Sequence, residues 1–159
     1  MTAVVYGSST GNTEEVAGKT AAALGNADVL AVSDCDADKL KGYDRLILGT
    51  STWGIGDLQD DWDEKLEILS QLDYSGKTVA LFGLGDQEGY SDSFVDAMAP
   101  LKKEILAAGG TLKGKWPVEG YEFSSSASVE DDSFIGLALD EDNQSNLTDE
   151  RIKLWVSSL

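Results

Sequence analysis

Short apolar runs alternate with amphipathic segments along most of the chain. The apolar runs lie at residues 3–6, 28–32, 45–49, 78–83 and 111–115, with a further short run at 134–139. They are continuously apolar, which is typical of strands buried on both faces of a parallel sheet. Apolar residues at helical spacing follow in segments 13–25, 60–71, 92–108 and 148–158. The pattern therefore predicts an α/β fold: an open, doubly wound parallel sheet with helices on both faces.

Two features interrupt this alternation. Pro100 lies inside segment 92–108, so we expect that helix to kink or divide near residue 99. Residues 116–133 contain Pro117, three consecutive serines and an acidic cluster, and predict a long surface loop between two pieces of the last strand. Loops of that length without secondary structure of their own are usually functional. The length suits one core and no linker divides the chain, so we expect residues 1–159 to form a single domain.

Composition and charge exclude several functions. The chain has no histidine and only one cysteine, Cys35, which argues against histidine acid–base chemistry, an intrachain disulfide and a metal site. A net charge of -17 argues against nucleic acid and anionic membranes as partners. No apolar run is long enough to insert into a membrane, and no basic and apolar leader follows Met1, so we expect a cytoplasmic protein. The acidity either serves solubility or attracts basic partners, and composition does not separate the two.

Residues 7–13, Gly-Ser-Ser-Thr-Gly-Asn-Thr, connect the first predicted strand to the first predicted helix. The loop combines four hydroxyls with two glycines and carries no charge. Backbone amides and hydroxyls at the N-terminus of a helix bind anions such as phosphate. The alternative is an ordinary strand-to-helix turn with a Ser, Thr or Asn cap. In open parallel sheets, ligands bind beyond the carboxyl ends of the strands, where the strand order reverses, and this loop lies at such an end.

Two further loops, 50–57 and 84–91, each carry one aromatic residue among glycines and small polar residues. If the first, third and fourth strands are neighbours, Trp53 and Tyr90 would flank one slot with the hydroxyl-rich loop at its end. A flat ring with a phosphorylated tail fits such a slot. Alternatively, Trp53 packs in the core and Tyr90 is a turn residue. The agreement of three loops at one edge of the sheet favours the slot.

Four motifs make the chain resemble the long-chain flavodoxins over nearly its whole length. The motifs are Thr10-Gly11-Asn12-Thr13, Thr52-Trp53-Gly54-Ile55-Gly56, Gly83-Leu84-Gly85-Asp86-Gln87 followed by Gly89-Tyr90, and the run from Phe134 to Ser145. The resemblance implies a three-layer flavodoxin-like fold. Its five-stranded parallel sheet has the order 2-1-3-4-5, and a long loop interrupts the last strand. It also implies non-covalently bound FMN as the cofactor.

By the same resemblance, residues 8–13 would wrap the FMN phosphate, while Trp53 and Tyr90 would sandwich the isoalloxazine ring. Backbone groups around Gly54 and Gly85 would contact the polar edge of that ring. The full set of expected FMN-binding residues is Ser8, Ser9, Thr10, Gly11, Asn12, Thr13, Ser51, Thr52, Trp53, Gly54, Ile55, Gly56, Leu84, Gly85, Asp86, Tyr90 and Ser93. The chain departs from a common family pattern at three of them. Asn12 stands where lysine is common, Leu84 where a hydroxyl is common, and Ser51 where proline is frequent.

The function implied by the resemblance is low-potential, one-electron transfer by a carrier whose FMN shuttles between semiquinone and hydroquinone. No catalytic residue is expected. Acidic residues around the slot disfavour further negative charge, which lowers the second potential. Gly54 is expected to let its peptide turn the carbonyl toward the flavin on reduction. The implied partners of this expected monomer are basic-surfaced redox proteins: ferredoxin/flavodoxin-NADP reductase, photosystem I or other ferredoxin-dependent enzymes.

Three other functions are compatible with an α/β chain of this length: a quinone reductase, a receiver domain and a Walker-type NTPase. An FMN-dependent NAD(P)H:quinone reductase would need a second pocket for a nicotinamide, and the chain shows no additional nucleotide signature. A receiver domain would need acidic residues after the first and third strands, where the chain has Gly7-Ser8 and Thr50-Ser51. A Walker-type NTPase is excluded because the complete motif Gly-x-x-x-x-Gly-Lys-Ser/Thr is missing. The aspartates within 57–63 either form a docking rim or stabilise a helix N-terminus, and both can hold.

Overall fold

A parallel sheet forms the middle layer of the computed structural model, which describes residues 1–159. Its strands lie in the order β2 (Ala27–Ala31), β1 (Thr2–Tyr6), β3 (Arg45–Trp53), β5 (Thr78–Leu84) and β10 (Leu137–Leu139). The two-residue strand β6 (Leu112–Lys113) pairs with the beginning of β5, and β10 pairs with its end. The last strand is therefore divided into two pieces, and the predicted order 2-1-3-4-5 is confirmed.

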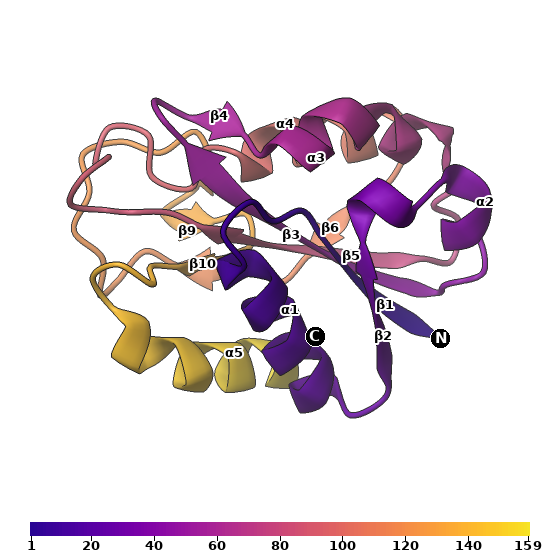
Figure 1. Ribbon diagram of the computed structural model, residues 1–159, viewed down its shortest axis with the longest axis horizontal. Coiled ribbons are helices and arrows are strands. Elements are labelled where there is room, and N and C mark those ends of the chain that lie inside the picture. Colours follow the sequence, from indigo (N-terminus) through magenta and orange to yellow (C-terminus); the bar gives the residue numbers. More distant parts are fainter.

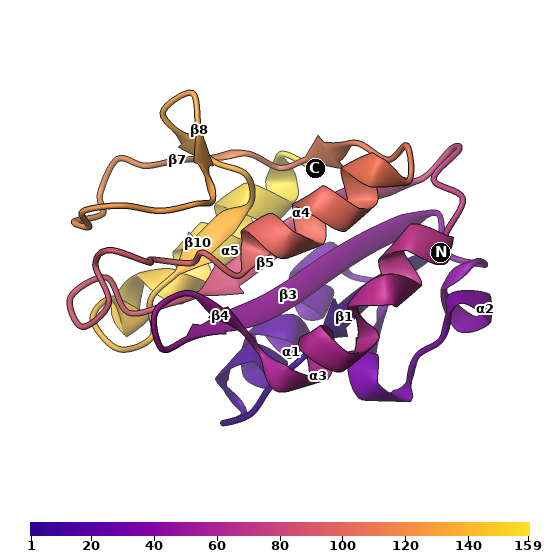
Figure 2. The same cartoon turned by 90° about the horizontal axis from the view of Figure 1, so that it is seen from above.

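Helices cover both faces of this sheet (Figure 1). On one face α1 (Asn12–Leu24) contacts α5 (Thr148–Ser157). The other face carries α3 (Asp60–Lys65), which continues as a 3₁₀ helix over Leu66–Gln71, and α4 (Met98–Ala107). Figure 2 shows α3 and α4 on the near side of β3 and β5, with α1 and α5 behind. Short helical segments complete the chain at Val32–Asp34, at Ala37–Leu40 (α2) and at Ser145–Leu147.

Side chains along the central strands β1, β3 and β5 alternate between two hydrophobic cores. Val5 packs with Trp62 and Met98 in the larger core, whereas its neighbour Val4 packs with Trp155 in the smaller one. All five side chains are fully buried. Because both faces of the sheet are covered, inward and outward positions are both apolar, which is why the strands read as continuous apolar runs. None of the helices combines the length and the apolar composition that crossing a bilayer requires.

Strand β3 continues four residues beyond its predicted end. Thr50 and Ser51 pair with β5, and Thr52 and Trp53 pair with the antiparallel two-residue strand β4 (Asp57–Leu58). The prediction of a loop was therefore wrong for residues 50–53. Their small polar side chains suggest a turn, but neighbouring strands supply backbone partners, and tertiary pairing outweighs that local preference.

The helix predicted over 92–108 begins only at Met98. Pro100 lies in its first turn, where an amide has no acceptor within the helix, so proline causes no kink there. The expected kink near residue 99 is thus wrong, whereas the alternative, a division of the segment near that residue, agrees with a helix that begins at Met98. The preceding residues 92–97 form turns, and Val95 has an unusual φ of 49°. Gly109, with a φ of 90°, follows the end of the helix as expected.

The insertion contains more structure than the predicted surface loop. Strands β7 (Trp116–Pro117), β9 (Ser133–Phe134) and β8 (Val129–Glu130) form a small antiparallel sheet in that order. Phe134 belongs to this small sheet and not to the last strand of the main sheet. Its ring lies 5.0 Å from that of Tyr121 and 5.7 Å from that of Phe94, measured between centroids. The insertion is therefore packed against the segment that leads into α4.

Candidate functional site

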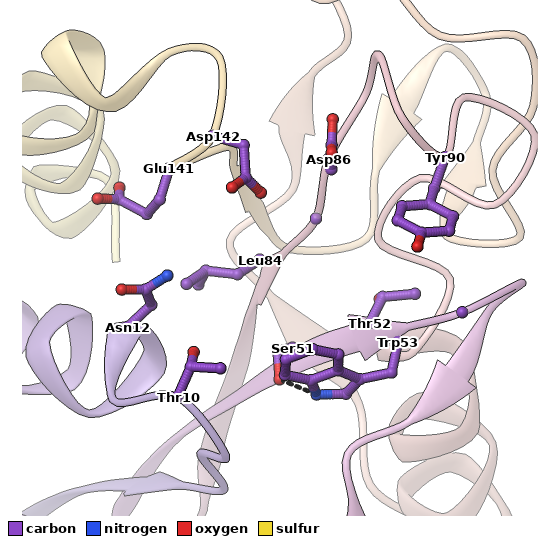
Figure 3. A pocket seen from close by; sticks show the side chains of 12 residues that line it. Thr10, Asn12, Ser51, Thr52, Trp53, Leu84, Asp86, Tyr90, Glu141 and Asp142 are labelled. Carbon is purple, nitrogen blue, oxygen red and sulfur yellow. Dashed lines mark hydrogen bonds between the residues drawn. The ribbon is translucent and has the colours of Figure 1, made fainter.

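A cavity of about 260 Å³ opens at the carboxyl edge of the sheet. Its walls come from the β1–α1 loop, the end of β3 and the following turn, the end of β5 and the following segment, and the loop after β10 (Figure 3). The lining residues are Thr10, Asn12, Ser51, Thr52, Trp53, Gly54, Leu84, Gly85, Asp86, Tyr90, Glu141 and Asp142. The three loops expected to converge therefore do so, beside the point where the strand order reverses between β1 and β3.

The β1–α1 loop presents unpaired backbone amides. Gly11, with a φ of 94°, precedes α1, and its amide donates to Ser8 Oγ at 2.9 Å, which closes the loop. The amides of Asn12, Thr13 and Glu14 have no acceptor within the chain, and no side chain caps this helix. A bound anion would satisfy these amides. The structure thus contradicts the alternative of an ordinary turn with a Ser, Thr or Asn cap.

Trp53 and Tyr90 lie at the opposite end of the cavity from Thr10 and Asn12 (Figure 3). Their side chains are 40% and 50% exposed, respectively, so neither is a core residue. Trp53 Nε1 donates to Ser51 Oγ at 2.9 Å, which fixes the indole against the wall. Large aromatic surfaces left open beside a cavity are suited to stacking on a flat ring.

Most of the expected site residues line the cavity. Those that do not are Ser8, Ser9, Gly11, Thr13, Ile55, Gly56 and Ser93. Thr13 and Ser93 are buried, and Ser9 Oγ accepts a hydrogen bond from Gln59 Nε2 at 3.1 Å. Ile55 is 88% exposed in the turn after β3, so its side chain lies outside the cavity. These residues shape the loops around the site, and their contribution to binding stays a prediction.

Sequence reasoning missed Glu141 and Asp142, which follow β10 and complete the wall. The signal was available, because every strand of a parallel sheet that runs to this edge delivers the following loop to it. Burial and the charges of Asp86 and Asp140 raise the pKa of Asp142. By contrast, hydrogen bonds from the Gly89 amide, the Asn143 side chain and the Glu88 amide lower the pKa of Asp86. These carboxylates are suited to accept hydrogen bonds from hydroxyl groups of a ligand.

The charge around the cavity is strongly negative. No lysine or arginine occurs within residues 1–18, 46–64, 78–101 or 116–150, the segments that include every loop at this edge. In α3, Asp60, Asp61 and Asp63 lie in the first turn, where they also interact favourably with the helix dipole. The charged side chains that line the cavity, Asp86, Glu141 and Asp142, are therefore all acidic.

Known proteins place the chain in a family. A model of the flavodoxin family matches residues 4–155. The flavodoxin of Picosynechococcus sp. is 47% identical over 157 residues, covering 97% of this chain and 92% of that protein. Flavodoxin 1 of Salmonella typhimurium is 44% identical over 162 residues, covering 100% and 92%. The structure of Fusobacterium nucleatum flavodoxin bound to flavin mononucleotide superposes with a TM-score of 0.92 at 30% identity, covering 98% and 94% of the two chains. With its motifs, its strand order and these matches over nearly the whole length, the chain belongs to the flavodoxin family.

Proposed function

We propose that this chain binds FMN in the cavity and carries single electrons. The observation that carries the proposal is the arrangement of the cavity walls. Unpaired amides lie at one end, and the half-exposed rings of Trp53 and Tyr90 lie at the other. Unpaired amides are suited to bind a phosphate, and exposed aromatic side chains are suited to stack on a flat ring. FMN joins a phosphate to a flat ring. Flavodoxins are electron carriers, and the two Fusobacterium nucleatum flavodoxin structures that resemble this chain are bound to flavin mononucleotide.

The phosphate would be held without a cation. The amides of Asn12, Thr13 and Glu14 point out of the N-terminus of a 13-residue helix, whose dipole favours negative charge. The hydroxyl of Thr10 and the amide side chain of Asn12 add neutral donors at the same end. Neither lysine nor arginine lies in this loop.

The ring would lie between Trp53 and Tyr90, with Leu84 as an apolar contact. Two glycines shape the backbone there. Gly54 has a φ of 52°, which glycine adopts at little cost. A Cβ at Gly85 would lie 3.0 Å from the backbone nitrogen of Val95, so glycine at this position lets the end of β5 pack closely against the following segment. Carboxylates of Asp86, Glu141 and Asp142 would accept hydrogen bonds from the hydroxylated chain between ring and phosphate.

Bound FMN supplies the redox chemistry, and this chain's residues bind, orient and surround it. The negative surface around the cavity opposes the addition of negative charge to a bound group. We therefore expect the potential of the second electron to be low. No side chain is assigned a catalytic role.

Partners would be redox proteins with basic surfaces, because the chain has a net charge of -17 and the charged side chains that line the cavity are all acidic. The proposed partners are ferredoxin/flavodoxin-NADP reductase, photosystem I and other ferredoxin-dependent enzymes, which exchange electrons with carriers of this kind. Ile55, highly exposed in the turn between β3 and β4, offers an apolar contact to such a partner. We propose that the chain acts in the cytoplasm as a monomer of one domain.

The test begins with the purified apoprotein. Titration with FMN should quench the flavin fluorescence at a ratio of one to one, and stepwise reduction of the complex should resolve two one-electron potentials. A protein that fails to quench FMN fluorescence would refute the proposal. Incubation of the complex with NADPH and a quinone separates a carrier from a quinone reductase, because a carrier alone should show negligible turnover.

A further inference from the structure

Asp140, directly after β10, is the only acidic side chain that is fully buried. No lysine or arginine forms an ion pair with it. Its Oδ2 accepts hydrogen bonds from the amide of Gln87 at 3.1 Å, from Gln87 Nε2 at 2.7 Å and from Asn143 Nδ2 at 2.9 Å. Its Oδ1 accepts from the amides of Asp142 and Asn143 at 3.1 and 3.0 Å. A buried carboxylate is costly unless it is fully hydrogen-bonded, and this one is satisfied by neutral donors alone.

Gln87 connects this carboxylate to two other parts of the chain. The side chain is itself buried, and its Oε1 accepts a hydrogen bond from the amide of Glu122 in the insertion at 2.6 Å. Asn143 makes a second connection, because its Nδ2 also donates to Asp86 Oδ1 at 2.8 Å. Together these bonds join the segment after β5 to the end of β10 and to the insertion.

The segment that is held in this way forms one wall of the cavity. Residues 85–97 contain neither helix nor strand, yet they carry Asp86 and Tyr90. Without a backbone ladder, the position of such a segment depends on its side-chain and loop contacts. The end of β10, in contrast, is paired with β5, so Asp140 is attached to the rigid sheet. Asp140 thus links a fixed strand to an irregular segment.

We propose that Asp140 and Gln87 are positioning residues for the FMN site. Asp140 and Gln87 do not line the cavity themselves. They hold segment 85–97 so that Tyr90 and Asp86 face the cavity. The inference rests on the FMN binding proposed above.

The test measures FMN affinity in Asp140→Asn, Gln87→Ala and the double variant. In Asp140→Asn, an NH2 group replaces one acceptor oxygen, so in either orientation of the amide it faces donors, those of Gln87 and Asn143 or the amides of Asp142 and Asn143, and the network is disrupted. Each single variant should bind FMN about tenfold more weakly, the scale of one net hydrogen bond. The double variant should lose no more than the larger single loss, because both changes remove the same connection. Gln87→Ala alters no charge, so a change in the visible circular dichroism of bound FMN would report a moved wall.

Gln144→Ala is the matched control. Gln144 is close in sequence and also contacts the insertion, with Nε2 donating to the Gly120 carbonyl at 2.9 Å, but it makes no hydrogen bond to segment 85–97. The FMN affinity of Gln144→Ala and the visible circular dichroism of its bound FMN should equal those of the wild type.

The outcomes separate this inference from the proposed function. A wild-type protein that binds no FMN would overturn both. If the wild type binds and the Asp140 and Gln87 variants bind equally well, only the positioning role is overturned. The positioning role is also overturned if the loss of FMN affinity in the double variant equals the product of the two single losses, because independent effects multiply in this way. If far-ultraviolet circular dichroism shows that Asp140→Asn does not fold, Gln87→Ala, which keeps the other donors to Asp140, decides the question.

Discussion

Truncation of Trp53 tests the most direct consequence of the site geometry. The side chain is 40% exposed, which leaves roughly 100 Å² for a ligand to cover on a residue of about 250 Å². At about 25 cal/mol per Å², this surface corresponds to about 2.5 kcal/mol of binding free energy. Stacking adds about 1 kcal/mol beyond the area. Trp53→Ala should therefore weaken FMN binding roughly 60- to 300-fold.

Fluorescence titration of the apoprotein with FMN measures this loss. Trp53→Phe keeps a flat ring and should recover most of the affinity. Leu154→Ala is the control, because Leu154 is a similarly exposed apolar residue on α5 and does not line the cavity. Binding by Trp53→Ala within about threefold of the wild type, far below the loss calculated from the buried area, would refute stacking on the indole.

Three further changes test other parts of the site and the fold. Gly54→Val should lower the first one-electron potential of the complex, because a β-branched residue resists the positive φ and restrains the peptide; an unchanged potential in potentiometry would remove Gly54 from redox tuning. Asp142→Asn should raise the free energy of unfolding at neutral pH. Burial and neighbouring carboxylates raise the pKa of Asp142, so the folded wild type loses stability as pH rises from 3.8 through the raised pKa. The variant should therefore be more stable than the wild type only above pH 3.8. A stability gain of the variant that persists below pH 3.8 in urea unfolding would contradict this. Tyr121→Phe removes the hydroxyl that accepts from Trp116 Nε1 at 2.9 Å and should cost about 1–3 kcal/mol in urea unfolding. Since burial raises the pKa of Tyr121 to about 12, the wild type but not the variant should lose this contribution as pH rises from 10 to about 12; equal alkaline profiles would contradict it.

The strand order and layers follow from the sequence because burial on both faces leaves a strong local signal. The errors occur where non-local contacts decide. Phe94 lies at helical spacing with Met98, yet its ring packs against Phe123 and Tyr121 of the insertion, with centroids 5.4 and 5.8 Å apart. Its apolar character therefore reflects a tertiary contact and not a helix face, and the predicted start of the helix was too early by six residues.

The candidate site was only partly predictable for the same reason. The hydroxyl-rich loop and the glycine-flanked aromatics are contiguous motifs, so their residue types indicate their chemistry. The connection from Gln87 to Asp140 spans 53 positions, and nothing local in either residue distinguishes a buried hub from a surface pair. Glu141 was missed although the rule that located the other loops applies equally to the loop after the last strand.

The two aromatic walls of the cavity are held by different means, and this difference has consequences. Trp53 ends β3, where its backbone pairs with Asp57 of β4, and the same strand pairs with β5 up to Ser51, so Trp53 is attached to a strand ladder. Tyr90 belongs to a segment without such pairing, which depends on side chains from the end of β10 and on the insertion. Amides near Tyr90 should therefore exchange with solvent through smaller local openings than those near Trp53. It follows that substitutions distant in sequence can alter the Tyr90 wall while leaving the Trp53 wall intact, which makes the insertion and the β10 loop the parts of the chain through which the site can be tuned.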